Sequence, residues 1–337
     1  MGFQSVSDSE LDSFVKGANA GSFFHTSVWR SFLQRRGSRP SYHVVSQGNG
    51  SITALFPYFS EPVGRGLGVV LSSMPKSDVG GPLFAPGTPV ETICRDFLRR
   101  LKWSRVLAVH SSGISEERIK TALSIGTSRV SSSRGFFLLN LSVNPTQHLW
   151  NEIFTKKHQQ RKFVRRAEDL GLSAVILSLK RDYDTFYEIY GETVRGAGGN
   201  PRSFPFFTSL WSELGPDHFK VLAMKDSSGN LVGGLGFHLF PAKRSAHVII
   251  AGYRKNVPGV EVNLVNEWHL MLWCEKNGVE LINFGATPDD PNSGLYKFKR
   301  NLGATFARCF NVSNVVAPKP VYALAQRTNG IIGAMRG

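Results

Sequence analysis

Residues 219–253 read FKVLAMKDSSGNLVGGLGFHLFPAKRSAHVIIAGY, three runs of apolar and β-branched residues separated by two short polar segments. Runs of this kind between turn-forming residues predict three successive strands, over 219–226, 230–240 and 245–253. An apolar helix over 263–276 and a further strand over 279–285 are predicted next. A three-stranded meander followed by a helix and a strand predicts a mixed α+β domain.

The rest of the chain mixes helices and strands in a similar order, and the polar segment VNPTQ (143–147) separates two halves. In the first half the sequence predicts helices over 9–19, 23–37, 92–103 and 116–125, strands over 41–47, 51–60, 105–110 and 136–142, and loops between short strands over 61–90. In the second half it also predicts a long helix over 147–170 ending at Gly171, a strand over 172–179, helices over 182–195 and 206–214, and a last strand over 304–314. We therefore expect two tandem α+β domains, 1–143 and 144–315, each a mixed sheet flanked by helices. A C-terminal tail, 316–337, could pack back on the first domain.

The charge of the chain points to an anionic partner. Its 337 residues include 40 Lys and Arg against 25 Asp and Glu, a formal net charge of +15. Bases without acids occupy residues 156–166 and the whole stretch after Asp290. Such an excess favours nucleic acid, a membrane surface or a phosphorylated substrate as partner, although an ordinary basic surface has the same composition.

Composition and motifs exclude several other classes of protein. A hydrophobic content of 41% excludes a disordered chain. The three cysteines, Cys94, Cys274 and Cys309, form no CxxC pair and fit a reducing cytoplasm. The sequence has no apolar run long enough to span a membrane, no signal-peptide pattern at its start and no Walker, HExxH or GxSxG motif. Its histidines lack metal-site spacing, so we expect no metal and no bound cofactor.

Four stretches carry a family resemblance. They are SSMPKSDVGGPLF (72–84), WNEIFTKKHQQRKFVRRAEDLGL (150–172), FYEIYGETVRGAGGNPRSFPFF (186–207) and LINFGATPDDPNSGLYKFKRNLGA (281–304). Together they resemble, in the same order, segments of the FemAB-type aminoacyltransferases, which include the enzymes that build peptidoglycan bridges. The resemblance extends over residues 20–310, and the FK…G signature within 281–304 is its most specific part.

The resemblance implies two GNAT-like acyltransferase domains and the transfer of an activated acyl group to an amine. In the bridge-forming members the donor is aminoacyl-tRNA, and the acceptor is a peptidoglycan precursor that bears phosphates. We accordingly expect a cytoplasmic transferase acting on a cell-envelope or related small-molecule acceptor, with tRNA as a partner and no role for DNA. Peripheral membrane contact stays open, and the sequence does not define an oligomeric state.

Lys299 is the first candidate catalytic residue, because it holds the position of the family's FK lysine. A lysine at a strand or loop end beside Gly303 can neutralise a phosphate or a developing oxyanion. Tyr296 is the second candidate, although a tyrosine next to a glycine is often simply packed. Acylation of an amine needs mainly positioning and oxyanion stabilisation, so no catalytic triad is expected.

The basic helix supplies candidate donor-binding residues. Lys157, Arg161 and Arg165 are spaced i, i+4 and i+8, which puts them on one face of a continuous helix. Such a face can track the phosphates of tRNA, although a charge run is also typical of a plainly solvated surface.

Candidate acceptor-binding residues come from two other motifs. Tyr190, Arg195 and Arg202 belong to the third family stretch, and arginine binds carboxylate or phosphate bidentately. Asp78 is the acid beside the first stretch. For each arginine the alternative is a structural ion pair.

Two departures from related patterns leave alternatives open. The loop RKNVPGVEVNL (254–264) lacks the Q/R-x-x-G-x-G/A pattern with which CoA-using GNAT enzymes bind pyrophosphate, which favours a different donor. Leu83-Phe84-Ala85 follows Gly81-Pro82 where bridge-forming members tend to have an aspartate, so a murein acceptor is not assumed. A CoA-dependent N-acyltransferase and a non-catalytic protein that binds RNA or another anion remain the two alternatives.

Overall fold

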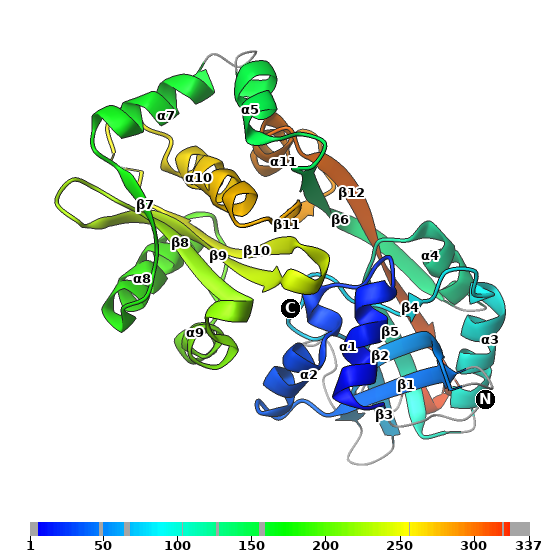
Figure 1. The fold of residues 1–337 in the computed structure, drawn as a ribbon. Coiled ribbons are helices and arrows are strands. Elements are labelled where there is room, and N and C mark those ends of the chain that lie inside the picture. The colour runs from blue at the N-terminus through cyan, green and yellow to red at the C-terminus, as the bar shows by residue number, and fades with distance from the viewer. Residues whose placement is uncertain are drawn as a thin grey trace. The chain divides into compact units, whose positions relative to one another are not determined.

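The structure is a computed structural model of the 337-residue chain. It describes residues 6–46, 50–63, 68–102, 104–125, 128–154, 159–255, 257–318 and 320–323. The chain divides into two compact units, which are visible in Figure 1. Unit 1 comprises Met1–Gly135 with Arg308–Gly337, and unit 2 comprises Phe136–Ala307.

Unit 1 is an α+β unit with strand order β1-β2-β3-β5-β12-β6, and β4 pairs with β2. Its strands are β1 (Pro40–Ser46), β2 (Ile52–Val63), β3 (Gly68–Ser73), β4 (Leu83–Phe84), β5 (Val106–Ile114) and parts of β6 (Arg129–Asn140) and β12 (Thr305–Val315). Its helices are α1 (Asp8–Gly17), the 3₁₀ turn η1 (Phe23–His25), α2 (Ser27–Gln34), α3 (Val90–Leu101) and α4 (Glu117–Leu123). Phe97 of α3 stacks on Phe56 of β2 with ring centroids 4.0 Å apart, at the centre of the unit's core.

Unit 2 has the strand order β6-β11-β10-β9-β8-β7. Besides the end of β6, its strands are β7 (Ser173–Ile176), β8 (Phe219–Lys225), β9 (Leu231–Phe240), β10 (Ser245–Tyr253) and β11 (Leu281–Pro288). Its helical elements are α5 (Thr146–His148), the π turn η3 (Leu149–Ile153), α7 (Gln159–Asp169), α8 (Lys180–Gly196), α9 (Phe204–His218), the 3₁₀ turn η4 (Pro241–Lys243), α10 (Val262–Lys276) and α11 (Gly294–Asn301).

The predicted meander is confirmed. β8, β9 and β10 pair antiparallel in sequence order, and α10 then connects β10 to the parallel strand β11. Helices cover both faces of this sheet, α7 and α10 on one side and α8 and α9 on the other (Figure 1). Two adjacent glycines allow this close packing. A Cβ at Gly233 would lie 2.8 Å from Asn266 of α10, and one at Gly234 would lie 3.0 Å from Phe186 of α8.

The helix predicted over 147–170 is represented by α5, η3 and α7 on the two sides of residues 155–158, which lie outside the described residues. Two other predictions made from local pattern are wrong in detail. Residues 294–301, expected at a strand or loop end, form helix α11 instead. Residues 68–73, placed among loops, form β3, which lies between β2 and β5 in the sheet. The local sequence signal is weak in both cases. Strand β3 is stabilised by pairing with its neighbouring strands, and helix α11 is stabilised by its N-cap, Ser293.

The two units divide the chain at 135/136 and 307/308, whereas the sequence predicts boundaries at 143/144 and 315/316. Both divisions fall inside strands, β6 and β12, which each contribute residues to both units. The described part of the tail contacts unit 1. Backbone amides of Val316 and Ala317 donate to Leu107, and Tyr322 packs against the small cluster around Val70.

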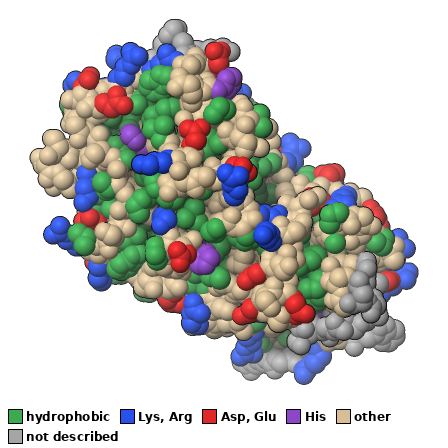
Figure 2. All heavy atoms as spheres, viewed as in Figure 1, with side chains coloured by type: hydrophobic (Ala, Val, Ile, Leu, Met, Phe, Trp, Pro, Cys, Tyr) green, Lys and Arg blue, Asp and Glu red, His purple; other side chains and the backbone are tan. Residues whose placement is uncertain are grey.

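No helix among the described residues is long and apolar enough to cross a membrane. On the face drawn in Figure 2, Lys and Arg side chains are scattered among acidic and apolar ones. The positive charge of the chain is therefore spread over this face of the molecule.

Candidate functional site

Strands β10 and β11 are parallel neighbours for a short distance and then separate. Pairing covers Ser245–His247 with Leu281–Asn283, and beyond it β10 has a bulge between Val248 and Ile250 in its register with β9. At the same level β11 passes through Gly285 with φ +78°. A Cβ at this position would lie 2.5 Å from the carbonyl oxygen of Val248, so glycine is required here. Bulges and diverging strands re-aim main-chain groups, and we take this divergence point as the candidate active site.

Lys299 reaches the divergence point from α11. Its side chain is buried, with 6% of the residue exposed, and its ammonium donates to the carbonyl oxygen of Gly285 at 3.1 Å and to the hydroxyl of Thr287 at 2.9 Å. A longer bond of 3.4 Å reaches the carbonyl oxygen of Ala286. Because an ammonium has three donors, these acceptors match its capacity. Lys299 therefore connects α11 to the end of β11 where the two strands part.

Glu267 of α10 is a buried acid, and the charge of Lys299 affects its pKa. Only 3% of Glu267 is exposed, and its Oε2 has no hydrogen-bond partner among the described residues. Burial raises the pKa of the Glu267 carboxyl to about 8, against the opposing effect of the Lys299 charge. A carboxyl with such a pKa can exchange a proton near neutral pH, which is the property required of a general acid or base.

Tyr296 lies one turn before Lys299 on α11, and its ring is packed. The ring centroid is 4.8 Å from that of Phe137 and 4.9 Å from that of Phe306. The helix begins at Ser293, whose hydroxyl accepts the backbone N–H of Tyr296 at 3.3 Å. The contacts of the ring fix the orientation of α11 and so the position of Lys299.

Of the predicted acceptor-binding residues on and after α8, Tyr190 and Arg202 form hydrogen bonds that hold the segment after α8 against this helix. The phenol oxygen of Tyr190 accepts the backbone N–H of Arg202 at 3.0 Å, and the Tyr187 hydroxyl donates to the Arg202 carbonyl oxygen at 3.0 Å. The guanidinium of Arg202 lies over the ring of Phe206, 5.3 Å from its centroid. Arg195 is exposed at the end of α8, and its guanidinium lies back against Gly191. Tyr190 and Arg202 are thus brought together, whereas Arg195 stays on the surface.

Asp78 belongs to unit 1 and lies in the loop between β3 and β4. Its carbonyl oxygen is so near Gly113 that a Cβ there would lie 2.6 Å away, and Gly113 has φ +67°. The loop is therefore packed tightly on β5. Asp78 is half-buried and belongs to a different unit from Lys299.

Arg161 and Arg165 of the predicted basic helix have different surroundings. The guanidinium of Arg161 donates to the carbonyl oxygen of Trp150, with an Nε–O distance of 2.9 Å, and lies over the Trp150 ring. Arg165 is exposed on α7 and has no hydrogen bond or ion pair among the described residues. Lys157 lies outside the described residues. The predicted common face is therefore represented in the structure by Arg161, which is engaged, and Arg165, which faces solvent.

The start of α10 differs from an anion-binding helix terminus. Its N-cap residue is Glu261, an acid without a capping hydrogen bond, placed where a helix dipole would otherwise favour a phosphate. Nearby, a cavity of about 680 Å³ lies between the end of α8 and the end of β10. It is lined by Glu192, Thr193, Gly196, Ala197, Tyr253, Arg254 and Lys255.

Glu267 and Thr287 are the site residues that the sequence analysis missed. Thr287 gives no recognisable signal, because its role depends on the turn of β11 at Gly285. Glu267 does give one: it is the single acid before the last turn of the mostly apolar segment VNLVNEWHLMLWCEK (262–276). A charged residue on the buried side of a helix is a marker of function or of a paired charge.

Comparison with known proteins agrees with this geometry. Residues 155–300 match the family model described as an acetyltransferase (GNAT) domain. Among curated protein sequences, none matches the chain.

Solved structures match over almost the whole chain. FemX is 13% identical and superposes with a TM-score of 0.75, covering 96% of this chain and 99% of FemX. A tandem GNAT protein from the clavulanic acid biosynthesis pathway is 12% identical, with a TM-score of 0.56 and coverage of 94% and 98%. The C-terminal domain of a protein assigned as a lysylphosphatidylglycerol synthetase, from Agrobacterium fabrum, is 13% identical, with a TM-score of 0.56 and 98% coverage of both chains.

Residues 155–300 therefore match a GNAT acetyltransferase domain, and the whole chain has the fold of FemX and of a tandem GNAT protein.

Proposed function

We propose that this acyltransferase moves an aminoacyl group onto an amine, with aminoacyl-tRNA as its donor. The observation that carries the proposal is the divergence point of β10 and β11, held by Lys299 inside a GNAT domain of a chain with the FemX fold. There, a neutral amine attacks the carbonyl carbon of the donor ester, and the tRNA ribose oxygen leaves. The three donors of the Lys299 ammonium bond to protein acceptors, so its charge would act through space on developing negative charge. Glu267, which its raised pKa of about 8 keeps protonated at neutral pH, is the candidate group to give a proton to the leaving oxygen and to take one from the attacking amine.

Two features support tRNA as the donor. Arg165 and its neighbours Lys162 and Arg166 are exposed on α7, so they are available to phosphates. The start of α10 presents Glu261, whose charge opposes a pyrophosphate at the place where CoA would need one.

Acetyl-CoA is the second candidate donor. The family model that matches residues 155–300 is an acetyltransferase model, which favours a thioester donor. In this reaction the amine attacks the thioester carbon and the CoA thiolate leaves, so the role of the divergence point stays the same.

For the acceptor we propose a phosphate-bearing amine from the cell envelope, handled in the cytoplasm. The lysylphosphatidylglycerol synthetase domain supports the phosphate-bearing part of this proposal by its name alone.

Donor competition tests the proposal. Charged tRNA and acetyl-CoA are each titrated against the protein, with filter binding at low and moderate salt for tRNA and thermal unfolding for both. A ligand that binds only the native state raises the midpoint, by an amount that grows with its concentration over Kd. We expect charged tRNA to bind with strong salt dependence and acetyl-CoA to leave the midpoint unchanged. Stabilisation by acetyl-CoA together with absence of tRNA binding at low salt would replace the tRNA proposal with the CoA one.

A further inference from the structure

A second cavity lies in unit 1, away from every residue assigned to acyl transfer. Its volume is about 440 Å³, within the range of small-molecule sites. It is bounded by helix α3, the residues that follow α4 and the end of β12. The lining residues are Arg95, Leu98, Arg99, Lys102, Ile125, Asn314, Val315 and Val316.

Three bases on one side of α3 give this cavity its charge. Arg95, Arg99 and Lys102 follow one another at helical spacing and are exposed. None of the three forms an ion pair with a carboxylate among the described residues, and the described residues that line the cavity include no acid. Glu91 stands one turn before Arg95 on α3 but does not line the cavity. The cavity therefore presents uncompensated positive charge.

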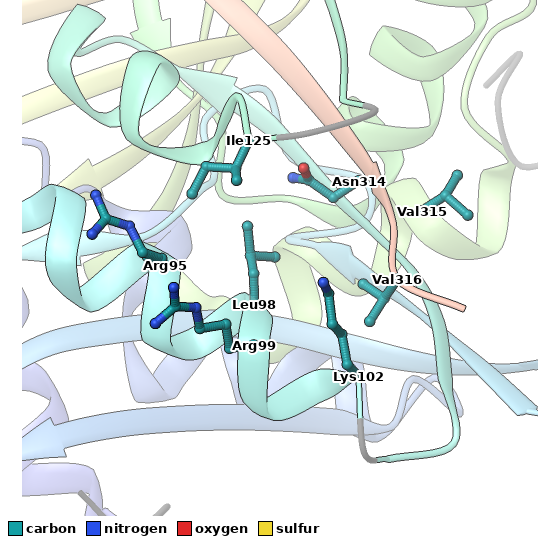
Figure 3. Close-up of a pocket in the computed structure, with 8 residues that line it drawn as sticks. All are labelled: Arg95, Leu98, Arg99, Lys102, Ile125, Asn314, Val315 and Val316. Atoms are coloured by element: carbon teal, nitrogen blue, oxygen red, sulfur yellow. The ribbon is translucent and has the colours of Figure 1, made fainter. Parts of the chain in front are cut away.

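Asn314 provides a second and independent indication of a ligand. It is 4% exposed on β12, and its Nδ2 has no hydrogen-bond partner among the described residues. In Figure 3 the Asn314 amide points into the cavity, and the side chains of Leu98 and Lys102 extend toward the same space from α3. A buried amide donor without an acceptor is unfavourable, and an anion oxygen in the cavity would remove that cost.

The remaining lining is apolar. Leu98 and Val316 form part of the wall, and Ile125, which is 40% exposed, closes the opposite side in Figure 3. A bare inorganic anion would leave this surface without a contact. A ligand with a charged head and an apolar or flat body would use both surfaces.

We propose that this cavity, which we name the α3 pocket, binds an organic phosphate. Its phosphoryl oxygens contact Arg95, Arg99, Lys102 and the Nδ2 of Asn314, and its organic part packs on Leu98, Ile125 and Val316. The proposal does not depend on the identity of the acyl donor, because no residue of the α3 pocket belongs to unit 2.

Isothermal titration of the full-length chain tests the proposal with three probes. ADP represents a soluble organic phosphate, dihexanoyl phosphatidylglycerol below its micellar concentration represents a lipid headgroup, and inorganic pyrophosphate represents charge alone. We expect saturable one-site binding of ADP or of the lipid, and binding of pyrophosphate at least tenfold weaker. Which of the two organic probes binds more tightly identifies the source of the phosphate.

Variants connect the binding to the pocket. Arg99→Glu and Asn314→Asp each replace attraction with repulsion, and we expect each to weaken the preferred probe at least tenfold. Arg100→Glu is the matched control, since Arg100 neighbours Arg99 in the sequence but does not line the pocket. We expect it to change affinity about twofold or less at physiological salt. Absence of binding by both organic probes, equal binding of pyrophosphate, or equal losses in Arg99→Glu and Arg100→Glu would each overturn the proposal. Circular dichroism of each variant confirms that it is folded.

Discussion

At the scale of single residues, Lys299 has a structural role, and the proposed function would add a chemical one. Lys299 satisfies two main-chain carbonyl groups and a hydroxyl at the end of β11, and its charge opposes the rise in the pKa of the buried Glu267. Any loss of activity after its removal therefore has to be separated from a loss of stability.

The first prediction concerns Lys299→Met, which keeps the length of the side chain and removes the ammonium. The carbonyl groups of Gly285 and Ala286 would lose their buried donor, so we expect the free energy of unfolding to fall by about 1–3 kcal/mol. Acyl transfer by the folded fraction should fall by about 100-fold, as expected when one oxyanion-stabilising group is removed. Denaturant unfolding and single-turnover kinetics measure the two effects.

Lys297→Met is the matched control, because Lys297 lies on the same helix and is exposed. It should be nearly neutral in both measurements. If Lys299→Met lost stability but transferred acyl groups at the normal rate, Lys299 would be a purely structural residue.

At the scale of secondary-structure elements, the divergence of β10 and β11 rests on one glycine. Gly285 has φ +78°, and its α-carbon approaches the carbonyl of Val248 too closely for a side chain. We expect Gly285→Ala to cost about 2 kcal/mol or more in the free energy of unfolding, through backbone strain and steric overlap.

Gly294→Ala is the control for this change. Gly294 lies in the first turn of α11, and a Cβ added there would have no atom within 4 Å, so alanine should be neutral or slightly stabilising. Equal effects of the two substitutions in urea unfolding would show that the approach to Val248 does not constrain β11.

Arg161 and Arg165 of the basic segment are predicted to behave differently. Arg165 is exposed, so Arg165→Ala should remove about one phosphate contact and reduce the slope of log K against log salt for tRNA by about 0.7–0.9. Arg161 is held by the carbonyl oxygen of Trp150, so Arg161→Ala should lower the unfolding midpoint and leave that slope unchanged. Filter binding over a salt series and thermal unfolding check both expectations. Identical slopes for Arg165→Ala and the wild type would remove α7 from the donor-binding surface.

The secondary-structure elements also show how much of the fold the sequence predicts. Long apolar segments were predicted correctly, as the meander β8-β9-β10 and helix α10 show. Helix α11 and strand β3 were not, because Ser293 caps the helix and neighbouring strands pair with β3, and neither effect has a clear local pattern.

The family motif indicated Lys299 as a candidate, and its role in the reaction stays a prediction. The hydrogen-bond partners of Lys299 come from β11, which the sequence separates from it. No periodicity in the chain indicated that Gly285 and Thr287 bind this lysine or that its charge acts on Glu267.

At the scale of the whole molecule, buried titratable groups in both units determine how stability depends on pH. Burial lowers the pKa of His43 to about 4 and lowers those of His110 and His269 from their usual value of 6.5. The folded protein therefore binds fewer protons than the unfolded chain below pH 6.5, and acidification favours unfolding.

Glu267 acts in the opposite direction. Its folded pKa of about 8 exceeds the usual value of 4.5, so between these values the folded protein keeps a proton that the unfolded chain has released. Stability from this group is complete below pH 4.5 and is lost as pH rises toward 8. Below pH 6.5 the three histidines oppose Glu267 and Glu61, whose pKa is also raised by burial, whereas above pH 6.5 the effect of Glu267 remains.

We therefore expect maximal stability near pH 6.5, with a decline toward pH 8 of at most about 1.4 kcal/mol per pH unit, the value for one proton. Glu267→Gln removes the titrating group and should flatten the profile between pH 6.5 and 8 while leaving the acid side unchanged. Glu168→Gln, at an exposed position of α7, should leave the whole profile as in the wild type. Urea unfolding at half-unit steps of pH measures all three proteins. A decline that persists in Glu267→Gln would assign the alkaline loss to another group and would remove the basis for Glu267 as a proton-transfer group near neutral pH.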